Sequence, residues 1–368
     1  MFTITHRWQQ ARSGQLHTDH GLVPTPAFMP IATRGSLKHL ANSDLTTIGN
    51  DIILANTYHL FLRPGIKVLK QVGGLHQFMH WTKPILTDSG GYQVFSLARL
   101  RLVSPDGVRF NSHIDGHEFF FTPELAMDIQ AAIGSDIRMC FDYFPGYPAN
   151  RAQVEESVRL TTNWAERCRA VHSVETSRER SLLFGIVQGS TWPDLRARSA
   201  SELRAIGFDG YAIGGLAVGE PPEIMYHVLD ATVPLLPAEQ PRYLMGVGQP
   251  EQILQAVKRG IDMFDCVLPT RNARHGQVYV HTASQLVEQN LSLVHYTKLS
   301  LDNLSYQTDS QPLDPLCDCS TCTSGYSRAY LRYLFSVHEP LAARLATVHN
   351  VSFYIQLLRD IRINLALY

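Results

Sequence analysis

Short apolar runs alternate with amphipathic, helix-like stretches along most of this sequence, and this alternation restricts the possible folds more than any other feature. Residues 152–171 and 250–260 carry apolar side chains at spacings of three and four, as amphipathic helices do. Strands that alternate with helices form a parallel sheet, and eight such units close into a barrel. We therefore predict an α/β fold of the (β/α)8, or TIM, barrel class. Its eight strands are expected at residues 27–31, 51–55, 84–87, 136–141, 182–187, 210–214, 242–247 and 262–268.

The chain length fits this prediction. With 368 residues and 45% hydrophobic content, the chain is long enough for one large barrel with an appended part, since (β/α)8 barrels alone run to roughly 250 residues. An open, doubly wound parallel sheet is the alternative architecture. Its dinucleotide-binding fingerprint is absent, because the glycine-containing segment GGLAVGE at 214–220 does not match it. We therefore favour the barrel.

Polar residues or glycines follow every predicted strand. The segments after the strands include NTYHL at 56–60, DSGGYQ at 88–93, QGS at 188–190 and PTRNAR at 269–274. Because all strands of a parallel barrel end on the same rim, these side chains are expected to surround one site. Barrel enzymes build their active sites on this rim, so the pattern predicts an enzyme.

Three acidic residues stand at predicted strand ends, namely Asp88, Asp142 and Asp265. A carboxylate in an apolar run costs free energy unless it is hydrogen-bonded or functional. Three on one rim indicate acid–base or nucleophilic chemistry, as in glycosyl transfer, where one carboxylate attacks the anomeric carbon and another moves the proton. Gln188 and the backbone of residues 214–216 add neutral donors and acceptors, which suit the edge of a heterocycle better than a phosphate.

Three of the six cysteines, Cys317, Cys319 and Cys322, lie within six residues of one another. Three thiolates and one imidazole form the closed tetrahedral shell of a structural Zn²⁺, so we expect this metal to stabilise the fold rather than take part in chemistry. The imidazole could come from His349 or from His338, since both lie in one predicted helical region about three turns apart. The other three cysteines lie in apolar or helical surroundings typical of buried thiols.

Two segments interrupt the barrel pattern. Residues 99–122 contain the turn signals Pro105-Asp106-Gly107 and Asp115-Gly116 between β-rich runs, which predicts a hairpin inserted after the third strand. Beyond residue 276 the pattern changes to short strands and the cysteine cluster, and a helical pattern then returns. The expected division is a barrel in residues 1–276, a zinc-binding subdomain in residues 277–350, and a C-terminal helix that returns to the barrel in residues 351–368.

The overall charge says little about partners. The formal net charge is −1, so a polyanion could be bound only by a local basic patch. The first ten residues, MFTITHRWQQ, lack the apolar core of a signal peptide, and no stretch approaches the roughly 18 apolar residues of a membrane span. We therefore expect a cytoplasmic protein without a membrane segment.

Several motifs together resemble the tRNA-guanine transglycosylases, also called queuine tRNA-ribosyltransferases. They are TDSGGYQVFSL at 87–97, FGIVQGS at 184–190, GYAIGGLAVGE at 210–220, RYLMGVG at 242–248, GIDMFDCVLPTRNARHG at 260–276, and the cysteine cluster with TVHN at 347–350. The resemblance runs from about residue 10 to residue 365. It implies a (β/α)8 barrel with a zinc subdomain. It also implies an enzyme that replaces the guanine at the wobble position of the tRNAs specific for Asp, Asn, His and Tyr, all of which have GUN anticodons.

The resemblance also implies roles for individual residues. Asp265 matches the nucleophile that attacks C1′ of the ribose and forms a covalent enzyme–tRNA intermediate, and Asp88 matches the general acid–base. Arg271 and Arg274 match residues that hold neighbouring nucleotides of the anticodon loop. The base-binding pocket is implied at Ser89, Asp142, Gln188, Gly215 and Leu216, with Tyr92 and Met245 sandwiching the base. The family's zinc-binding histidine lies in a His-Asn step, which selects His349 with Cys317, Cys319 and Cys322.

The family also suggests the incoming base and the assembly. Its bacterial members take preQ1, a small aminomethyl precursor, and its eukaryotic members take the bulkier queuine. This chain has Val218 where eukaryotic enzymes have glycine, and it has Phe141-Asp142-Tyr143-Phe144 where bacterial enzymes read FDEC. If Phe144 points at the pocket, both walls crowd a large substituent, so we expect preQ1. A homodimer is expected as well, and neither ATP nor a redox cofactor is required.

Two other functions of barrel enzymes fit the sequence less well. A barrel glycosidase would need paired carboxylates but neither a zinc subdomain nor the TRNAR segment, and an amidohydrolase would need His-x-His after the first strand, where Ile31-Ala32-Thr33-Arg34 stands. Two alternatives remain open. The same exchange could use queuine in salvage, or the chain could be a catalytically idle tRNA-binding paralogue. Both Asp88 and Asp265 are present, which favours an active enzyme.

Overall fold

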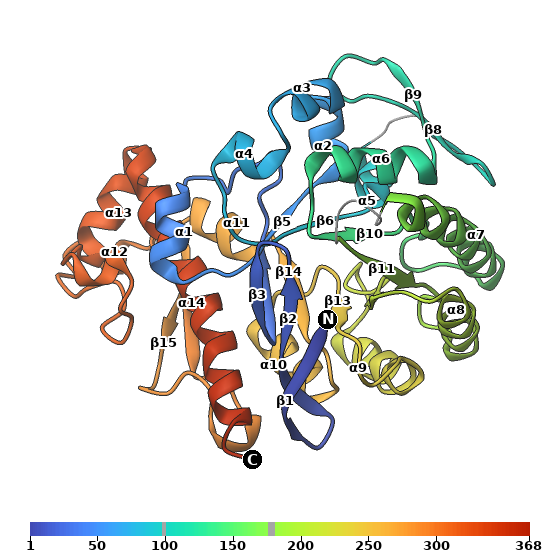
Figure 1. The fold of residues 1–368 in the computed structure, drawn as a ribbon. Coiled ribbons are helices and arrows are strands. Elements are labelled where there is room, and N and C mark those ends of the chain that lie inside the picture. The colour runs from blue at the N-terminus through green and yellow to red at the C-terminus, as the bar shows by residue number, and fades with distance from the viewer. Residues whose placement is uncertain (98–100, 176–180) are drawn as a thin grey trace.

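A nearly closed barrel of eight parallel strands forms the centre of the protein (Figure 1). The computed structural model describes residues 1–97, 101–175 and 181–368. β14 pairs with β4, and a parallel bridge between Ile31 and Leu54 brings β4 to β5, the two ends of the strand order. The prediction of a (β/α)8 barrel is therefore confirmed. The strands are β4 (Ala27–Pro30), β5 (Ile53–Ala55), β6 (Ile85–Thr87), β10 (Ile137–Met139), β11 (Leu182–Val187), β12 (Gly210–Ile213), β13 (Arg242–Leu244) and β14 (Met263–Cys266).

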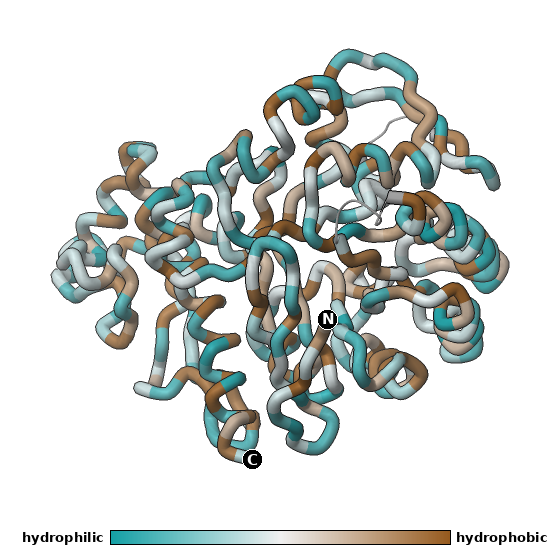
Figure 2. Tube along the Cα trace, viewed as in Figure 1, coloured by the Kyte–Doolittle hydropathy of each residue, from teal (hydrophilic) through white to brown (hydrophobic). Residues whose placement is uncertain are grey.

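Alternate residues of these strands face the barrel interior and the surrounding helices. Ala27 and Met29 belong to the cluster inside the barrel, whereas Phe28 between them packs in the outer core against the helices. This alternation follows from the two-residue repeat of a β-strand, and it explains why the strands read as continuous apolar runs. In Figure 2 the outer turns of helices α7 (Arg151–Glu175) and α8 (Pro193–Ile206) are largely hydrophilic.

Both helices predicted from periodicity lie around the barrel. α7 contains residues 152–171, and α10 (Pro250–Lys258) covers most of residues 250–260. The helices α6 (Pro123–Ile133), α8, α9 (Pro222–Thr232) and α10 each begin with proline. The N–H groups of the first turn have no partner within the helix, so proline, which lacks this group, costs no helical hydrogen bond there. The remaining bounds are α1 (Asn42–Ile48), α2 (Thr57–Leu62), α3 (Ile66–Gln71), α4 (Leu75–Met79), α5 (Gly91–Leu97) and α11 (Leu268–Arg274), with 3-10 turns at Val233–Leu235, Gln289–Leu291 and Leu304–Tyr306.

A three-stranded antiparallel sheet precedes the barrel and was not predicted from the sequence. It consists of β1 (Phe2–Trp8), β2 (Ala11–Thr18) and β3 (Gly21–Thr25). Leu16 and Val23 from this sheet join the interior cluster together with residues at the beginnings of the barrel strands. The sheet therefore covers the N-terminal end of the barrel, opposite the rim on which the strands end.

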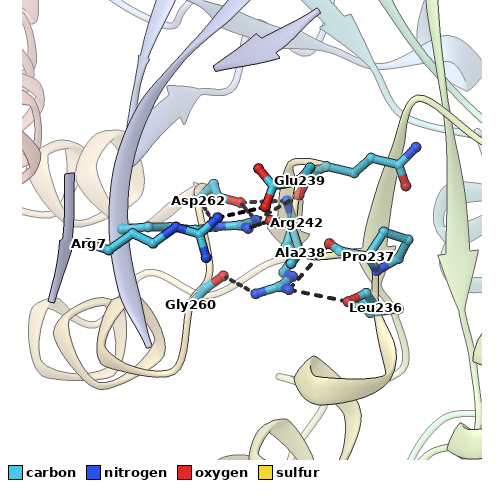
Figure 3. Close-up of polar contacts among 10 residues, drawn as sticks. Arg7, Leu236, Pro237, Ala238, Glu239, Arg242, Gly260 and Asp262 are labelled. Atoms are coloured by element: carbon cyan, nitrogen blue, oxygen red, sulfur yellow. Dashed lines mark hydrogen bonds and ion pairs between the residues drawn. The ribbon is translucent and has the colours of Figure 1, made fainter. Parts of the chain in front are cut away.

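A buried ion pair fastens this sheet to the barrel. The Nε and Nη2 atoms of Arg12 donate to the two carboxylate oxygens of Asp262 at 2.8 and 2.6 Å, and the backbone N–H of Arg242 donates to Asp262 at 2.7 Å. Figure 3 shows Asp262 beside Arg242, and Arg7 paired with Glu239, whose side chains are largely exposed. Because a bidentate, fully buried ion pair tolerates little displacement, it fixes the position of β2 relative to the residue that precedes β14.

The segment expected to form one hairpin contains three antiparallel strands. They are β7 (Arg101–Ser104), β8 (Gly107–Asn111) and β9 (Glu118–Phe121). Pro105 and Asp106 form the turn between the first two, and Asp115-Gly116 lies in the turn between the second and third. Both sequence turn signals are therefore used, and two turns join three strands. Residues 99 and 100, at the start of the expected hairpin segment, lie outside the described residues.

The C-terminal part consists of a small sheet and three helices on one side of the barrel (Figure 1). The expected boundary between residues 350 and 351 falls inside α14, which is one continuous helix of 26 residues. Among the described residues, no helix combines the length and the apolar character needed to cross a lipid bilayer. The elements are β15 (Gln277–His281), β16 (Tyr296–Ser300), α12 (Ser320–Thr323), α13 (Arg328–Ser336) and α14 (Pro340–Leu365).

Candidate functional site

A cavity of about 400 Å³ opens at the rim where the barrel strands end. It is lined by residues that follow β4, β5, β6, β10, β12, β13 and β14, so nearly every strand contributes to it. A larger hollow of about 790 Å³ lies between α7 and α8, but it contains none of the predicted site residues. The predicted residues that line the rim cavity are Asp88, Ser89, Tyr92, Asp142, Gly215, Leu216, Met245 and Asp265.

Asp88 lies directly after β6 and accepts three hydrogen bonds through its carboxylate. The backbone N–H of Thr57 donates to Oδ1 at 2.8 Å, Gln93 donates to Oδ2 at 2.8 Å, and the Asn56 amide also donates to Oδ2. Burial nevertheless raises the pKa of Asp88 to about 6, with a smaller contribution from the negative charge of Asp265. The carboxyl group is therefore able to change its protonation state near neutral pH.

Asp265 is the residue before the last one of β14, and its two carboxylate oxygens have different hydrogen-bond partners. The Tyr243 hydroxyl donates to Oδ1 at 2.5 Å, and the backbone N–H of Gly246 donates to the same oxygen at 2.8 Å. None of the described residues donates a hydrogen bond to Oδ2, and the residue lines the cavity. Burial raises the pKa of Asp265, and the two donated bonds oppose that shift. Both donated bonds thus reach Oδ1, and Oδ2 has no donor among the described residues.

Asp142 is the third carboxylate of the cavity and is held by neutral donors. Ser89 donates to Oδ1 at 2.7 Å, and the Gln188 amide donates to Oδ2 at 2.8 Å. Burial raises the pKa of Asp142 to about 6. Gln188 does not line the cavity itself and acts behind Asp142. Gly215 has a φ of +64°, and a side chain there would lie 2.7 Å from the Gln188 amide oxygen, so glycine is needed for this close approach.

The loop after β12 is closed by an acidic side chain. The Glu220 carboxylate accepts hydrogen bonds from the backbone N–H groups of Ala217 and Val218, at 2.5 and 3.0 Å. Ala217 has a φ of +56°, a conformation that two carboxylate contacts help to maintain. Val218 lines the cavity, and so does Phe144 from the loop after β10. Both residues therefore restrict the space beside Asp142.

Arg271 and Arg274 do not line the cavity but lie on α11, the helix that follows β14. Arg274 donates to the backbone carbonyl of Thr270 at 2.9 Å. The pKa of His39 is lowered by burial and by the positive charges of Arg274 and Lys38, which places these groups near one another. A basic rim therefore stands next to the end of β14, where Asp265 lies.

The predicted metal ligands come together in the C-terminal part. The thiol groups of Cys317, Cys319 and Cys322 and the imidazole of His349 have ligand atoms that all lie within 4.8 Å of one another. His349 Nε2 is 2.6 Å from the carbonyl of Tyr279, to which it donates, so Nδ1 is left with a lone pair facing the sulfurs, 3.4 Å from Cys322. The group can hold one tetrahedral ion, and its sulfur-rich donor set fits Zn²⁺.

His338 is not part of this group. It follows the end of α13 with a φ of +56°, before α14 begins at Pro340. The two histidines therefore lie in different elements, so spacing within one helix does not relate them.

A second group of potential ligands, His20, His76 and Asp136, lies on the N-terminal side of the barrel. The two imidazole rings stack with centroids 3.6 Å apart and planes inclined by 10°. Nearly parallel rings share no point that lies in both planes, so their lone pairs cannot converge on one ion. Asp136 also accepts bonds from the backbone N–H groups of His20 and Ile85, at 3.1 and 2.8 Å. The cluster therefore joins the turn after β2 to the start of β10.

Comparison with known proteins places this site in a family. The family model described as queuine tRNA-ribosyltransferase matches residues 7–366, nearly the whole chain. The chain belongs to the queuine tRNA-ribosyltransferase family. The resemblance seen in its motifs is thereby confirmed, and so is the prediction of an enzyme, since queuine tRNA-ribosyltransferases are tRNA-guanine transglycosylases.

Individual relatives in the queuine tRNA-ribosyltransferase family are similar over almost their full length. A protein of Pelotomaculum thermopropionicum named queuine tRNA-ribosyltransferase is 52% identical over 363 residues, which cover 98% of this chain and 93% of the relative. Proteins of the same name from Desulforamulus reducens and Thioalkalivibrio sulfidiphilus are 50% and 51% identical. In both of these cases, the match covers 96% of this chain and 90% of the relative.

Several residues around the carboxylates were missed in the sequence. Asn56, Thr57 and Gln93 hold Asp88, and Tyr243 and Gly246 hold Asp265. Asn56 and Gln93 stand in polar segments that follow strands, so their position on the rim was a usable signal. Tyr243 was hidden in an apolar run, where a buried aromatic side chain is ordinarily part of the core.

Proposed function

We propose that this protein exchanges guanine at the wobble position of tRNAs with GUN anticodons for preQ1, through a covalent enzyme–tRNA intermediate. The observation that carries the proposal is the pair of buried carboxylates, Asp88 and Asp265, which line one cavity with different hydrogen-bond environments. Asp265 has a carboxylate oxygen without a donor among the described residues, as a nucleophile requires. Asp88 has a pKa near neutrality, as a proton carrier requires.

The reaction proceeds as two displacements at C1′ of the ribose. In the first, Oδ2 of Asp265 forms a bond to C1′, the glycosidic bond breaks, and its electron pair leaves with guanine, which Asp88 protonates. In the second, Asp88 takes a proton from the incoming base, whose nitrogen attacks C1′ and releases the Asp265 carboxylate. Two inversions retain the sugar configuration. Tyr243 and Gly246 hold Oδ1 throughout and leave Oδ2 free to react.

The base lies in the pocket formed around Asp142. Asp142, Ser89 and the backbone at Gly215 and Leu216 present donors and acceptors to the edge of the base, and Gln188 contributes from behind the cavity lining by holding Asp142. Tyr92 and Met245 cover its faces. The target guanine has to leave the base stack of the anticodon loop to enter such a pocket.

Arg271 and Arg274 hold the nucleotides beside the reacting one. Both stand on the helix that directly follows Asp265, so a backbone phosphate next to the reacting ribose lies within reach of that basic rim. Because the net charge of the protein is −1, electrostatic attraction of the tRNA depends on local basic groups such as these two arginines. A tRNA substrate also implies that the protein works in the cytoplasm.

Incorporation of radiolabelled guanine into unmodified tRNA(Tyr) tests the proposal most directly. An active transglycosylase exchanges the label into the wobble position, and a tRNA lacking guanine there stays unlabelled. A protein that binds the tRNA without any exchange would instead be the catalytically idle paralogue.

We expect the protein to prefer preQ1 over queuine by at least about tenfold in kcat/KM, because steric rejection in a pocket reaches that magnitude. Phe144 and Val218 both line the cavity, and we propose that their side chains crowd the cyclopentenediol group of queuine. The measurement compares both bases on the same guanine-containing tRNA. Phe144→Cys and Val218→Gly should each shift the ratio toward queuine. A queuine value equal to or above the preQ1 value in the unchanged protein would overturn the choice.

Zinc is the ion proposed for the Cys317, Cys319, Cys322 and His349 group, with one Zn²⁺ per subunit and a structural role. We expect Cys319→Ala to lose the bound zinc and about 3 kcal/mol or more of stability, since binding energy at such sites is folding energy. Metal analysis and thermal unfolding check this, with Cys140→Ala, a buried cysteine outside the group, as the control. Unchanged zinc content and melting temperature in Cys319→Ala would show that the group is not a zinc site.

Loss of zinc should also weaken tRNA binding indirectly. Asn350, next to the ligand His349, donates to the carbonyls of Pro269 and Gln277 at 3.1 and 3.0 Å. Pro269 lies in the first turn of α11, the helix that carries Arg271 and Arg274. The zinc group and the basic rim are therefore linked through one side chain.

A homodimer is proposed on the basis of α13, which lies at the edge of the molecule (Figure 1). Tyr330, Tyr333 and Val337 are exposed at a spacing of three and four, and Tyr326 stacks on Tyr330 with ring centroids 5.8 Å apart. An exposed row of aromatic side chains of this kind is typical of a protein–protein contact. In a twofold dimer, the same row on the second subunit would pack against it.

We expect a dimeric mass in light scattering at micromolar concentration and a monomeric mass for Tyr333→Asp, because a buried, unpaired charge opposes association. Leu102→Asp changes an apolar residue on β7 that is 70% exposed, against 57% for Tyr333, and should remain dimeric. A monomeric mass for the unchanged protein would refute the proposed assembly.

A further inference from the structure

Two aromatic residues on the loop after β10 pack against two on α5. The rings of Tyr92 and Phe144 are inclined by only 3°, with centroids 5.7 Å apart. The Phe95 ring, also on α5, contacts the rings of Tyr143 and Phe144, whose centroids lie 4.9 and 6.3 Å from its own. These four rings join the helix that follows Asp88 to the loop that follows Asp142.

The loop side of this aromatic cluster is anchored to the protein. The backbone N–H of Tyr143 donates to the Thr161 hydroxyl at 3.1 Å, and the Ser157 hydroxyl donates to the Tyr143 carbonyl at 2.6 Å. Both anchoring residues are buried on α7. The backbone next to Phe144 is therefore held in place, so the Phe144 ring occupies a defined position at the cavity wall.

Tyr92 has much less support of its own. Its side chain lines the cavity and the residue is 55% exposed. Parallel rings whose centroids are 5.7 Å apart are displaced sideways, so Phe144 covers only part of one face of Tyr92. The uncovered surface remains available to a planar ligand in the cavity.

We propose that Phe144 is a positioning residue that holds the Tyr92 ring in the orientation in which it stacks on the substrate base. The inference rests on the proposed function and concerns planar, purine-like bases. A tyrosine that is already oriented loses less side-chain freedom when the base binds, so Phe144 strengthens base binding without contributing to the displacement at C1′. Its main effect therefore lies in KM for the base rather than in kcat.

The test uses labelled guanine as the base and unmodified tRNA as the second substrate. Phe144→Leu keeps an apolar side chain but removes the ring, and we expect the KM for guanine to rise about 2- to 10-fold with kcat changed less than about twofold. Phe144→Tyr retains the ring and should restore the KM. An unchanged KM in a folded Phe144→Leu protein would overturn the inference.

A double-mutant cycle separates action through Tyr92 from a general effect on the cavity. In a Tyr92→Leu background, Phe144→Leu should add little further increase in KM, because the residue it positions is gone. Val218→Ala, on the same cavity but outside the four-ring cluster, serves as the control and should add its full effect to Tyr92→Leu. Additive effects of Phe144→Leu and Tyr92→Leu would overturn the role given to Phe144.

Failure of the proposed function would look different. If the unchanged protein exchanged no guanine, both the proposed function and the role of Phe144 would fall. If guanine were exchanged but the cycle were additive, only the role of Phe144 would fall. Should Phe144→Leu not fold, Phe144→Met in the same cycle gives the same readout with a more adaptable side chain.

Discussion

The Asp265→Ala variant is expected to bind tRNA almost as well as the unchanged protein and to form no covalent adduct with it. Oδ2 of Asp265 is the proposed attacking atom, and removal of a nucleophile costs on the order of 10⁴-fold or more in rate. The tRNA contacts proposed for Arg271 and Arg274 lie on α11, outside the changed side chain. The Asp265→Ala variant should therefore retain its affinity for tRNA and lose adduct formation.

The adduct is measured by denaturing electrophoresis of protein trapped on tRNA, and affinity by filter binding. Asp265→Asn preserves the shape and should behave like Asp265→Ala, because an amide oxygen is a poor nucleophile. Cys266→Ala changes the next residue of the same cavity and should still form the adduct. A denaturant-resistant adduct in Asp265→Ala would show that another group attacks C1′.

The Asp88→Asn variant should lose turnover by at least about 10²-fold, the usual contribution of a general acid–base group. An amide cannot carry the proton that departing guanine receives and that the incoming base gives up. The same reasoning predicts that release of guanine slows as the pH rises above about 6, where Asp88 loses its proton. Single-turnover rates across this pH range check the prediction, and full turnover in Asp88→Asn would contradict it.

The pH dependence of the protein's stability tests the raised pKa of Asp88 independently. Burial raises the pKa of Asp88 from 3.8 to about 6, so the folded protein binds this proton more tightly than the unfolded chain does. Stability is therefore lost as the pH rises from about 4 to 6, by up to about 3 kcal/mol, and stays lower above that window. Asp88→Asn lacks this loss. Its stability relative to the unchanged protein should therefore improve across the window, as chemical denaturation at both pH values would show.

The barrel was predictable because each of its strands is buried on both faces. Such strands read as short apolar runs, and all eight expected runs contain a strand of the structure. The N-terminal sheet gave no comparable signal. β2 reads ARSGQLHT, and its stability depends on Leu16 entering the barrel and on Arg12 meeting Asp262, 250 residues further along the chain. A partner so distant leaves no local pattern.

The three aspartates of the candidate site could be predicted from the sequence, whereas most of the residues that form hydrogen bonds with them could not. Asp88, Asp142 and Asp265 stand out because charged residues are unusual at the end of an apolar run. The groups that set their properties, such as Asn56 for Asp88 and Tyr243 for Asp265, are ordinary residues until the fold brings them within hydrogen-bond distance. The family's His-Asn step selected His349 over His338, whereas periodicity alone did not indicate the break between α13 and α14 that separates the two residues.

The single helix α14 places two distant parts of the protein on one rigid axis. Its first half brings His349 to the cysteine group, and its second half packs against the barrel, where Arg362 donates to the carbonyl of Pro26 at 2.6 Å. Each residue of an α-helix adds about 100° of rotation and 1.5 Å of rise. An insertion or deletion of one residue between the two halves would therefore turn one set of contacts away from its partners. Substitutions between the two halves preserve this alignment, whereas a change in the number of residues between them does not.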